Sequence, residues 1–463
     1  MRYVNETVKD LNIAYIGGGS RGWAWGLMSD LASEEKLSGT VRLYDIDIEA
    51  SRNNEIIGNE LSKRNDVKGI WEYKAVDSLE KALTGADFVI ISILPGTFKE
   101  MASDVHTPEK YGIYQSVGDS TGPGGIIRAL RTIPMYVEIA EGIKAYSPNA
   151  WVINYTNPMS ICVKTLYKVF PEIKAFGCCH EVFGTQKLLA SMLHDMEGIE
   201  TPEREDIKVN VLGINHFTWI NKASYKGENL MPLYEKFAYK YYESGFEESD
   251  NEHWMNNSFA SANRVKFDLF KRYGSIAAAG DRHLAEFVPN SWYLKDIDTV
   301  KSWKFGLTTV DWRINDLNER LNKSKAYVTG KKEFELKKTG EEGVNQMKAL
   351  LGIGDMVTNV NILNSGQIST VPLGAVVETN ALFKKDTISP ITAGHLESDV
   401  NGIVLRNIMN VETVVEAALR KDLKLAYNAF ANDPLVNIGL KESKSLYDEM
   451  INNTKEYLTV YGL

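Results

Sequence analysis

A short stretch, FGCCHEVFGTQ (residues 176–186), holds two cysteines, a histidine and a glutamate in a chain of 463 residues with three cysteines and seven histidines. Thiolate, imidazole and carboxylate groups are the side chains that bind divalent metals. His216, in LGINHFTW, follows another apolar run. A thiolate from Cys179 and an imidazole from His216 would hold a metal ion and leave positions open for substrate oxygens. We therefore predict a catalytic metal site with these two ligands.

Three further polar residues extend the candidate site. Asn157 in NYTNPMS and Asp281 in AAGDRHLAEF offer an amide and a carboxylate among apolar or small residues, and a histidine, His180, directly follows Cys179. Taken singly, a free cysteine is commonly a small buried hydrophobe, and a lone histidine is more often a hydrogen-bonded core residue than a ligand. The combination of these residue types favours a functional cluster.

The elements that position these residues are typical of an α/β fold. The apolar run LNIAYIGGG predicts a strand, SRGWAWGLMSDLAS predicts a helix, and TVRLYDID and ADFVIISILPG predict the next two strands. Continuous apolar strands that alternate with helices indicate a parallel sheet covered on both faces. Further strands at AWVINYTN and IKAFGCC, separated by the helix MSICVKTLYKVF, extend the sheet to about residue 180. Cys179 then lies at a strand end, where open α/β sheets bind their ligands.

Three glycines follow the first predicted strand. Gly17, Gly18 and Gly19 lie where the strand turns into the first helix, the place where dinucleotide-binding folds bring a pyrophosphate against free backbone N–H groups. Asp45, at the end of the second strand, is placed to bind the adenosine ribose and disfavours the 2′-phosphate of NADP. A tight structural turn and a helix cap are the alternative interpretations. The combination favours NAD as the cofactor.

Beyond residue 180 the alternation of strands and helices weakens. One more strand is predicted at DIKVNVLGINH, and charged helical stretches such as VDWRINDLNERLNKSKAY and VETVVEAALRKDLKLAYNAF dominate. We therefore predict a Rossmann-like, NAD-binding domain over residues 1–180. A mixed α+β domain over residues 181–463 would serve substrate binding, metal binding and oligomerisation.

Composition and charge exclude several classes of function. The net charge is -9 and no basic block occurs, which argues against nucleic acid or an anionic membrane as a partner. The amino terminus lacks a signal-peptide pattern, and the longest apolar run, ADFVIISIL, is too short to cross a bilayer. Cys162, Cys178 and Cys179 are too few for a disulfide framework and are expected as free thiols. We expect a cytoplasmic protein that acts on a small molecule.

Seven motifs along the chain resemble the successive blocks of glycoside hydrolase family 4, the NAD- and manganese-dependent glycosidases: IGGGS, YDID, VGDSTGPGGIIRALRTIP, NYTNPMS, GCCHEV, GINHF and VPLGAVVETNALF. The resemblance implies a fold like that of lactate and malate dehydrogenases, NAD and Mn²⁺ as cofactors, and a homodimer or homotetramer. The residues CHEV resemble the branch that acts on α-linked uronic acids, and GCCHEVFGTQKLLA is most similar to the α-galacturonidases. His180 argues against a 6-phosphosugar, for which family members generally have asparagine at this position.

The same resemblance implies a role for each candidate residue. Cys179 and His216 match the two metal ligands, and Asn157 matches an asparagine that contacts the sugar near the metal. Asp281 lies in a block similar to that of the base that removes the C2 proton. The cofactor positions match Gly17, Gly19, Ser20 and Asp45. The implied reaction is oxidation at C3 by NAD⁺, loss of the C2 proton, elimination of the glycosidic oxygen, addition of water and re-reduction, which together amount to hydrolysis.

Two alternatives come from other classes. A malate- or lactate-type dehydrogenase would share the fold and the nicotinamide but would need no metal or thiolate, so the pair of Cys179 and His216 disfavours it. A protein that holds NAD without catalysis would be expected to lack Cys179, His216 or Asp281. Within the family, α-glucuronides and neutral α-galactosides are the alternative substrates. Arg128 and Arg282 are candidate partners of a uronate carboxylate, because a guanidinium can bind it through two parallel hydrogen bonds.

Overall fold

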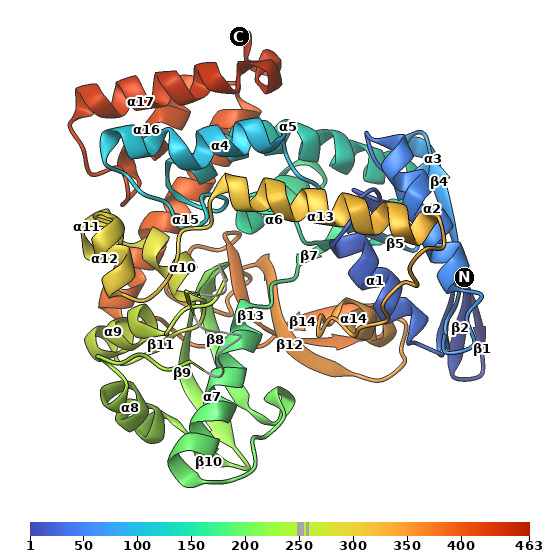
Figure 1. The fold of residues 1–463 in the computed structure, drawn as a ribbon, viewed down its shortest axis with the longest axis horizontal. Helices are drawn as coiled ribbons and strands as arrows, with labels where there is room; N and C mark the ends of the chain where they lie inside the picture. The colour runs from blue at the N-terminus through green and yellow to red at the C-terminus, as the bar shows by residue number, and fades with distance from the viewer. Residues whose placement is uncertain (248–253, 256–258) are drawn as a thin grey trace.

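A ten-stranded sheet runs through the computed structural model, which describes residues 1–247, 254–255 and 259–463. Six of its strands form a parallel block in the order β7, β6, β5, β2, β3, β4 (Figure 1). Their bounds are Thr7–Ile16 (β2), Leu37–Tyr44 (β3), Ile70–Val76 (β4), Phe88–Ile91 (β5), Trp151–Asn154 (β6) and Lys174–Gly177 (β7). β1 (Arg2–Val4) pairs antiparallel with β2. The predicted parallel sheet is therefore confirmed.

Helices cover both faces of the parallel block, because both faces of its strands are apolar. Along β2, Ile13 and Tyr15 pack on one face, whereas Ala14 and Ile16 pack on the other. The helices of the first face are α1 (Trp23–Ala32), α2 (Ile48–Leu61) and α14 (Gly343–Leu350), and those of the second are α3 (Leu79–Leu83), α5 (Gly122–Tyr146) and α6 (Met159–Val169). This three-layer arrangement is the Rossmann-like half that the sequence predicts.

Three strands from much later in the chain extend the same sheet. They are β12 (Met356–Leu363), β13 (Val376–Lys384) and β14 (Thr387–Pro390). β12 meets β7 where Asn361 lies opposite Gly177, and the added strands run antiparallel. A Cβ at Gly177 would lie 3.2 Å from Asn361 Cβ on β12 and 2.3 Å from Met159 Sδ on α6, so a side chain there would displace its neighbours. The domain boundary at residue 180 stays a prediction, and strands from both sides of it share one sheet.

A second, four-stranded antiparallel sheet belongs to the mixed half of the chain. Its strands are β8 (Lys208–Ile214), β9 (Phe217–Tyr225), β10 (Glu228–Asn229) and β11 (Ile276–Ala277). Val211 and Ile220 pack with α7 (Glu181–Glu197), α8 (Met231–Lys240) and α9 (Arg264–Tyr273). Leu212 and Trp219, on the other face, join a cluster with α5, α15 (Ser398–Leu419), α16 (Leu423–Asn432) and α17 (Leu440–Asn453). The predicted mixed α+β class of this half is confirmed.

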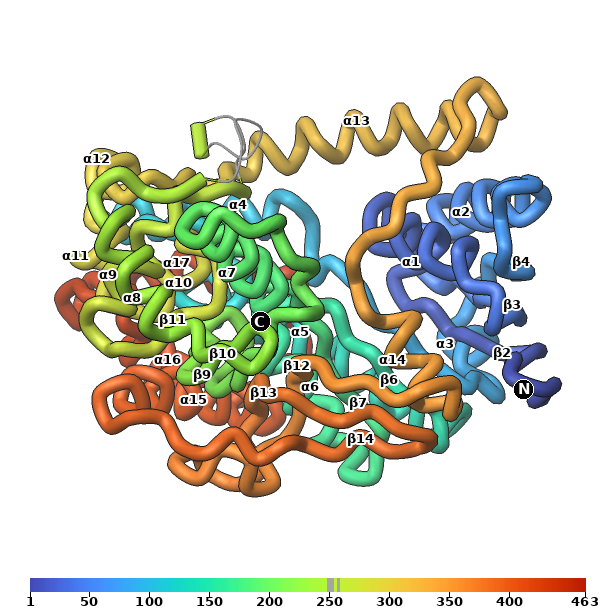
Figure 2. Tube along the Cα trace, turned by 90° about the horizontal axis from the view of Figure 1, so that it is seen from below, coloured from blue at the N-terminus to red at the C-terminus, as the bar shows by residue number. Residues whose placement is uncertain are grey.

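The two charged stretches predicted as helical are helical in the structure. VDWRINDLNERLNKSKAY lies within α13 (Val310–Val328), which runs along one side of the molecule between α4 (Phe98–His106) and α2 (Figure 2). VETVVEAALRKDLKLAYNAF is divided between α15 and α16, because Lys421 has a φ of 57° and Asp422 caps α16. Short helices follow β11: α10 (Asp281–Leu284), α11 (Asn290–Tyr293) and α12 (Ile297–Ser302). In the described part of the chain, no helix combines the length and the apolar character needed to cross a membrane.

Candidate active site

The glycine turn between β2 and α1 depends on the absence of side chains. Gly17 has a φ of +92°, and a Cβ there would lie 1.9 Å from the carbonyl oxygen of Ser92. A Cβ at Gly18 would lie 2.7 Å from the backbone of β3. Ser20 Oγ accepts a hydrogen bond from Trp23 N–H, the first residue of α1, at 3.2 Å. The turn therefore brings bare backbone to the start of a helix, as a bound pyrophosphate requires.

Asp45 closes this turn from the end of β3. Its Oδ2 accepts a hydrogen bond from Gly19 N–H at 2.9 Å, and its Oδ1 accepts one from Asp47 N–H at 3.0 Å. The N-cap of α2 is Asp47, whose Oδ1 accepts from Ala50 N–H at 3.1 Å. The helix-cap alternative for Asp45 is therefore wrong. Ile46 is 97% exposed, which leaves an apolar side chain beside the carboxylate where an adenosine would lie.

The remaining candidates come from loops at strand ends and from α10. Asn157 follows β6, directly before a cis peptide bond, and Cys179 follows β7. His216 lies in the two-residue turn between β8 and β9 and has a φ of 62°. Two residues that the sequence reasoning did not select join them: Asp119, just before α5, and His283, in α10. The strand ends therefore do collect polar residues, as the topology predicts.

Asp119, His216 and His283 form a group suited to a metal ion. Within the described residues, this one set of three potential ligands has its ligand atoms all within 4.8 Å of one another. The two imidazole rings are stacked, with centroids 4.0 Å apart and planes 29° apart. Burial, together with His283, lowers the pKa of His216 to about 3, so its imidazole is neutral at neutral pH. Burial opposes ionisation of Asp119, but the nearby Arg128 guanidinium holds the pKa of that carboxyl well below the usual range.

Hydrogen bonds fix the orientation of both imidazoles. Ser120 Oγ donates to Asp119 Oδ1 at 2.7 Å, so its oxygen is left to accept from His216 Nδ1, 3.0 Å away. Glu181 Oε1 lies 3.0 Å from His283 Nδ1. Glu181 Oε2 accepts a backbone N–H from the residue before α10 at 2.7 Å. A proton on each Nδ1 leaves each Nε2 free to bind a metal.

Asn157 lies against the same group. Its Nδ2 donates to Asp119 Oδ2 at 3.2 Å, and its carbonyl oxygen accepts from Arg128 Nε at 3.1 Å. Its side-chain Oδ1 is buried and has no hydrogen-bond partner among the described residues. A buried oxygen without a partner costs about 1–3 kcal/mol. Asn157 Oδ1 is therefore placed to accept a hydrogen bond from a ligand.

Cys179 is buried beside the hairpin turn and is not a member of the mutually close set. Its thiol lies near the side chain of Asn215 and the backbone of Glu181. Burial, with Glu378 and Glu181 nearby, raises the pKa of Cys179 well above the usual range, so the group is a thiol at neutral pH. A divalent metal would displace that proton.

His180 lies at the exposed side of these residues, with 57% of its side chain accessible. Its Nδ1 lies 3.1 Å from Glu341 Oε1, and this carboxylate raises the pKa of His180 above its ordinary value. The ring of Trp23 is 6.4 Å from the His180 ring and 5.1 Å from that of Tyr155. His180 therefore lies where the first turn of α1 meets the end of β7. Its raised pKa makes it suited to hold a proton.

Asp281 has both carboxylate oxygens engaged by backbone groups at the start of α9. Oδ2 accepts from Val265 N–H at 3.2 Å and Oδ1 accepts from Lys266 N–H at 3.1 Å. Burial raises the pKa of Asp281 to about 6. The structure thus gives this carboxylate a capping function and does not group it with Asp119, His216 and His283. Its role as the C2 base stays a prediction.

Both arginines considered for a uronate carboxylate are buried near Asp119. Each is close enough to interact with it electrostatically. The guanidinium of Arg282 lies 4.9 Å from the ring centroid of Phe259. Burial lowers the pKa of Arg282 to about 10, which leaves it cationic at neutral pH. Arg128 Nε donates to the carbonyl oxygen of Asn157 at 3.1 Å.

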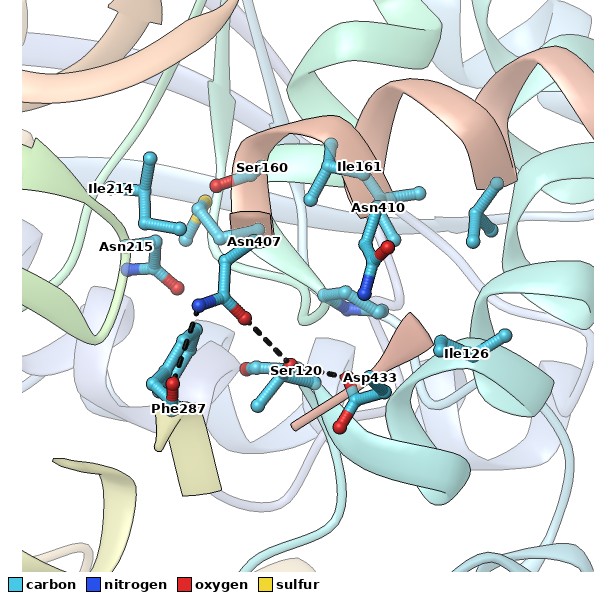
Figure 3. Close-up of a pocket in the computed structure, with 15 residues that line it drawn as sticks. Ser120, Ile126, Ser160, Ile161, Ile214, Asn215, Phe287, Asn407, Asn410 and Asp433 are labelled. Carbon is cyan, nitrogen blue, oxygen red and sulfur yellow. Dashed lines mark hydrogen bonds between the residues drawn. The ribbon is translucent and has the colours of Figure 1, made fainter. Parts of the chain in front are cut away.

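A small cavity adjoins the group on the side of α15 (Figure 3). Ser120, Asn215, Asn407 and Asp433 are among the residues that line it. Two of the lining residues are hydrogen-bonded to each other: Thr121 Oγ1 donates to Asp433 Oδ2 at 3.2 Å. The cavity has a volume of about 30 Å³, which is room for water and not for a sugar ring.

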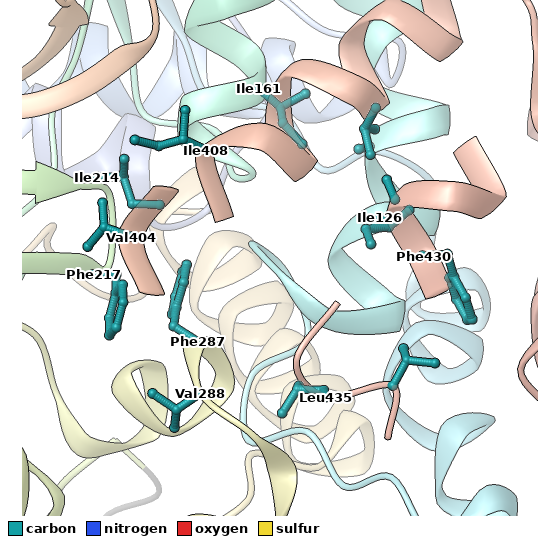
Figure 4. Close-up of a cluster of buried hydrophobic side chains, with 14 of the residues drawn as sticks. Ile126, Ile161, Ile214, Phe217, Phe287, Val288, Val404, Ile408, Phe430 and Leu435 are labelled. Atoms are coloured by element: carbon teal, nitrogen blue, oxygen red, sulfur yellow. The ribbon is translucent and has the colours of Figure 1, made fainter. Parts of the chain in front are cut away.

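A hydrophobic cluster supports the two histidine-bearing segments (Figure 4). The rings of Phe217 and Phe287 are stacked, with centroids 5.0 Å apart and planes 7° apart. Phe217 directly follows His216, and Phe287 lies about one helical turn after His283. The stack therefore links the hairpin turn to the segment that begins with α10.

Sequence reasoning missed Asp119, His283 and Glu378. Asp119 and Glu378 lie in the motifs VGDSTGPGGIIRALRTIP and VPLGAVVETNALF, and His283 is two residues after Asp281. Glu378 is buried on β13, where it accepts from Asn359 Nδ2 at 2.6 Å, and burial raises its pKa to about 7. The signal that would have found them is a charged or imidazole side chain inside an otherwise small or apolar motif.

Known proteins match nearly the whole chain. Residues 12–195 match the family 4 glycosyl hydrolase model, and residues 211–436 match the family 4 glycosyl hydrolase C-terminal domain. An α-galacturonidase of Thermoanaerobacterium saccharolyticum is 67% identical over 458 residues, 99% of this chain and 98% of that one. An α-galacturonidase of Bacillus subtilis is 54% identical, and the match covers 96% of this chain and 98% of that protein. An α-galactosidase of the same organism is 28% identical, and the match covers 97% of this chain and 99% of that protein. The crystal structure of lplD from Bacillus subtilis is 53% identical, with a TM-score of 0.92 over 96% of this chain and 100% of that one.

Proposed function

The chain belongs to family 4 of the glycosyl hydrolases, and from this we propose that it is an α-galacturonidase that uses NAD⁺ and a divalent metal, with Mn²⁺ as the first candidate. One observation supports the substrate class above all others. Full-length identity is 54% to 67% with α-galacturonidases and falls to 28% with an α-galactosidase. The motif CHEV, typical of the branch that acts on uronic acids, agrees with this substrate.

The residues present fit both cofactors. The bare backbone at Gly17 and the carboxylate of Asp45 suit a dinucleotide, and Cys179 and His216 would hold the metal next to the unpaired Oδ1 of Asn157. When bound, NAD⁺ would supply a hydride acceptor and donor at C3 of the sugar, and the metal would polarise the C2 and C3 oxygens. Family neighbours solved with NAD and Mn²⁺ have the same fold, at about a fifth of the residues identical.

The protein's own residues would position the sugar and move its protons. Asn157 Oδ1 would accept a hydrogen bond from a sugar hydroxyl. His180, oriented by Glu341, would hold a proton for the leaving glycosidic oxygen. Asp281, with a pKa near 6, is the proposed C2 base, and that task would require it to release one of its two backbone hydrogen bonds. Arg282 would pair with the uronate carboxylate.

The test is a hydrolysis assay on matched α-galacturonide, α-glucuronide and α-galactoside substrates, each with and without NAD⁺ and Mn²⁺. We expect turnover of the galacturonide that needs both additions and leaves no net NADH, because the hydride returns to the sugar in each cycle. Stoichiometric NADH would instead indicate a dehydrogenase. Equal turnover of the neutral galactoside would overturn the substrate class and leave the family unchanged. Light scattering on the purified protein would test the proposed dimer or tetramer.

A further inference from the structure

We infer that Asp119 and His283 bind the catalytic metal ion together with His216, and that Glu181 is the residue that positions His283. This inference rests on the proposed function, because it concerns the same metal. It goes beyond the pair of Cys179 and His216 that the sequence predicts.

The donor set itself points to a metal. Two imidazoles and one carboxylate are the side chains that occupy one face of a six-coordinate ion and leave its other positions open. The carboxylate suits Mn²⁺, and imidazoles bind first-row divalent metals such as Fe²⁺ and Zn²⁺. Donor atoms about 2.1 Å from a central ion lie about 3 Å apart when they share one face, and the three groups here lie within 4.8 Å of one another. A small side-chain adjustment would therefore complete the coordination.

The hydrogen bonds present each histidine in the form that a metal needs. His216 and His283 both have Nδ1 engaged, by Ser120 and Glu181 respectively, so Nε2 is the nitrogen that each ring has left for a metal. A carboxylate behind a histidine fixes the ring and makes its free nitrogen a better ligand. Glu181 is itself held, because its second oxygen accepts the N–H of Gly280 at 2.7 Å. Its position relative to α10 is therefore fixed by the backbone.

Two further observations set this group apart from an ordinary buried ion-pair cluster. Asn157 donates to Asp119, yet its own buried Oδ1 has no partner among the described residues. A cluster built for stability alone would satisfy that oxygen. In addition, the rings of Phe217 and Phe287, one from each histidine-bearing segment, are stacked within one hydrophobic cluster (Figure 4). Rigid support of this kind is what a preorganised site requires.

The experiment is a Mn²⁺ titration of the metal-free, full-length protein, without NAD⁺ or sugar, followed by the electron paramagnetic resonance signal of free Mn²⁺. His283→Gln keeps a donor for Glu181 and removes the ligand nitrogen, and Asp119→Asn keeps an acceptor for Ser120. We expect each to weaken Mn²⁺ binding by tenfold or more. Glu181→Gln should weaken it by about tenfold, the usual effect of losing the group behind a ligand.

A matched control and a ligand-specific signal complete the test. His395→Gln alters a histidine that is 63% exposed and 3.5 Å from Glu397, and it should bind Mn²⁺ like the wild type. Pulsed electron paramagnetic resonance should detect two ligating nitrogens in the wild type and in Glu181→Gln, and one in His283→Gln. Thermal melting of each variant confirms that it is folded, and if His283→Gln does not fold, Asp119→Asn and Glu181→Gln decide the question.

Wild-type Mn²⁺ affinity and two ligating nitrogens in His283→Gln would overturn the inference. If the protein hydrolyses galacturonides while His283→Gln binds Mn²⁺ normally, the proposed function stands and this inference fails. If His283→Gln loses Mn²⁺ affinity in a protein that hydrolyses no uronide, the inference stands and the proposed function fails.

Discussion

Cys178 and Cys179 are adjacent in sequence but lie in different environments. The thiol of Cys178 packs in the cluster under α14 and donates to Gln346 Oε1 at 3.0 Å, whereas Cys179 lies beside the hairpin turn. We expect Cys179→Ser to lose most hydrolytic activity and to bind Mn²⁺ more weakly, because a hydroxyl is a poor substitute for a thiolate ligand. Cys178→Ser should be mild, since a hydroxyl can still donate to Gln346. Turnover and Mn²⁺ affinity are to be measured for both variants. Equal losses in the two would contradict the assignment of Cys179 as the metal ligand.

Arg282 provides a test of substrate selection. Lysine at this position keeps the positive charge but loses the planar fork that binds a carboxylate through two hydrogen bonds. We expect Arg282→Lys to lower kcat/KM for the α-galacturonide by tenfold or more, about 1.4 kcal/mol, with little change for the α-galactoside. Arg320→Lys, on α13, serves as the control. An unchanged ratio of the two substrates would exclude Arg282 as the carboxylate partner.

Sequence reasoning at the scale of single residues found side chains that end predicted strands. Asn157, Cys179 and His216 could be identified from the sequence, because each follows an apolar run that predicts a strand and its direction. Asp119 precedes a helix and His283 lies in a single-turn helix, so neither position has a periodic signal. Their approach to His216 depends on how separate elements pack, which no local pattern specifies.

At the scale of elements, the hairpin and α10 depend on one aromatic stack. Phe287→Leu removes the ring that Phe217 stacks on, and we expect it to lower both the melting temperature and the Mn²⁺ affinity, because His216 and His283 lose their common support. Phe430→Leu makes a similar change in the same cluster, on α16. It should lower the melting temperature with Mn²⁺ affinity unchanged. Equal effects of both variants on affinity would show that the stack has no specific part in the site.

Sequence patterns predicted the parallel strands but not how strands from distant parts of the chain pair. The parallel strands were predictable because buried strands between helices are continuous apolar runs. The pairing of β12 with β7 was not, since an antiparallel contact between Asn361 and Gly177 leaves no local trace. The segment between α13 and α14 is rich in charged residues, yet Thr339 N–H donates to Asp30 Oδ1 at 3.1 Å and Glu341 Oε1 lies 3.1 Å from His180 Nδ1. A run of charges alone does not show which of its members find partners.

For the molecule as a whole, buried carboxyl groups predict how stability depends on pH. Glu286 Oε1 accepts from Val117 N–H at 2.8 Å and from Gly118 N–H at 2.9 Å, and burial raises its pKa from 4.5 to about 7. The folded protein therefore keeps a proton that the unfolded chain loses above about pH 4.5. Stability is therefore highest below about pH 4.5, decreases as pH rises from there to about 7, and is constant above, with a total loss of about 3 kcal/mol at most.

We expect the melting temperature of the metal-free protein to fall between about pH 4.5 and pH 7, with Glu378 contributing in the same direction because burial also raises its pKa from 4.5 to about 7. Glu286→Gln keeps an acceptor for both backbone N–H groups and cannot ionise. Calorimetry should show a smaller decrease over this interval for Glu286→Gln than for the wild type. An identical decrease would show that Glu286 does not ionise in the folded protein over this range.

The union of β12 with β7 also has a consequence for how the protein is made. While the chain is on the ribosome, the outer edge of β7 has no partner until Met356–Leu363 has been synthesised. At about 5–20 residues per second, the stretch from Gly177 to Met356 takes roughly 10–40 s to translate. During that interval the nascent chain presents a bare strand edge, the feature by which β-proteins aggregate. Chaperones that bind nascent chains would therefore be needed most while the second half is being translated, and a product released early would keep that edge exposed for as long as it survived.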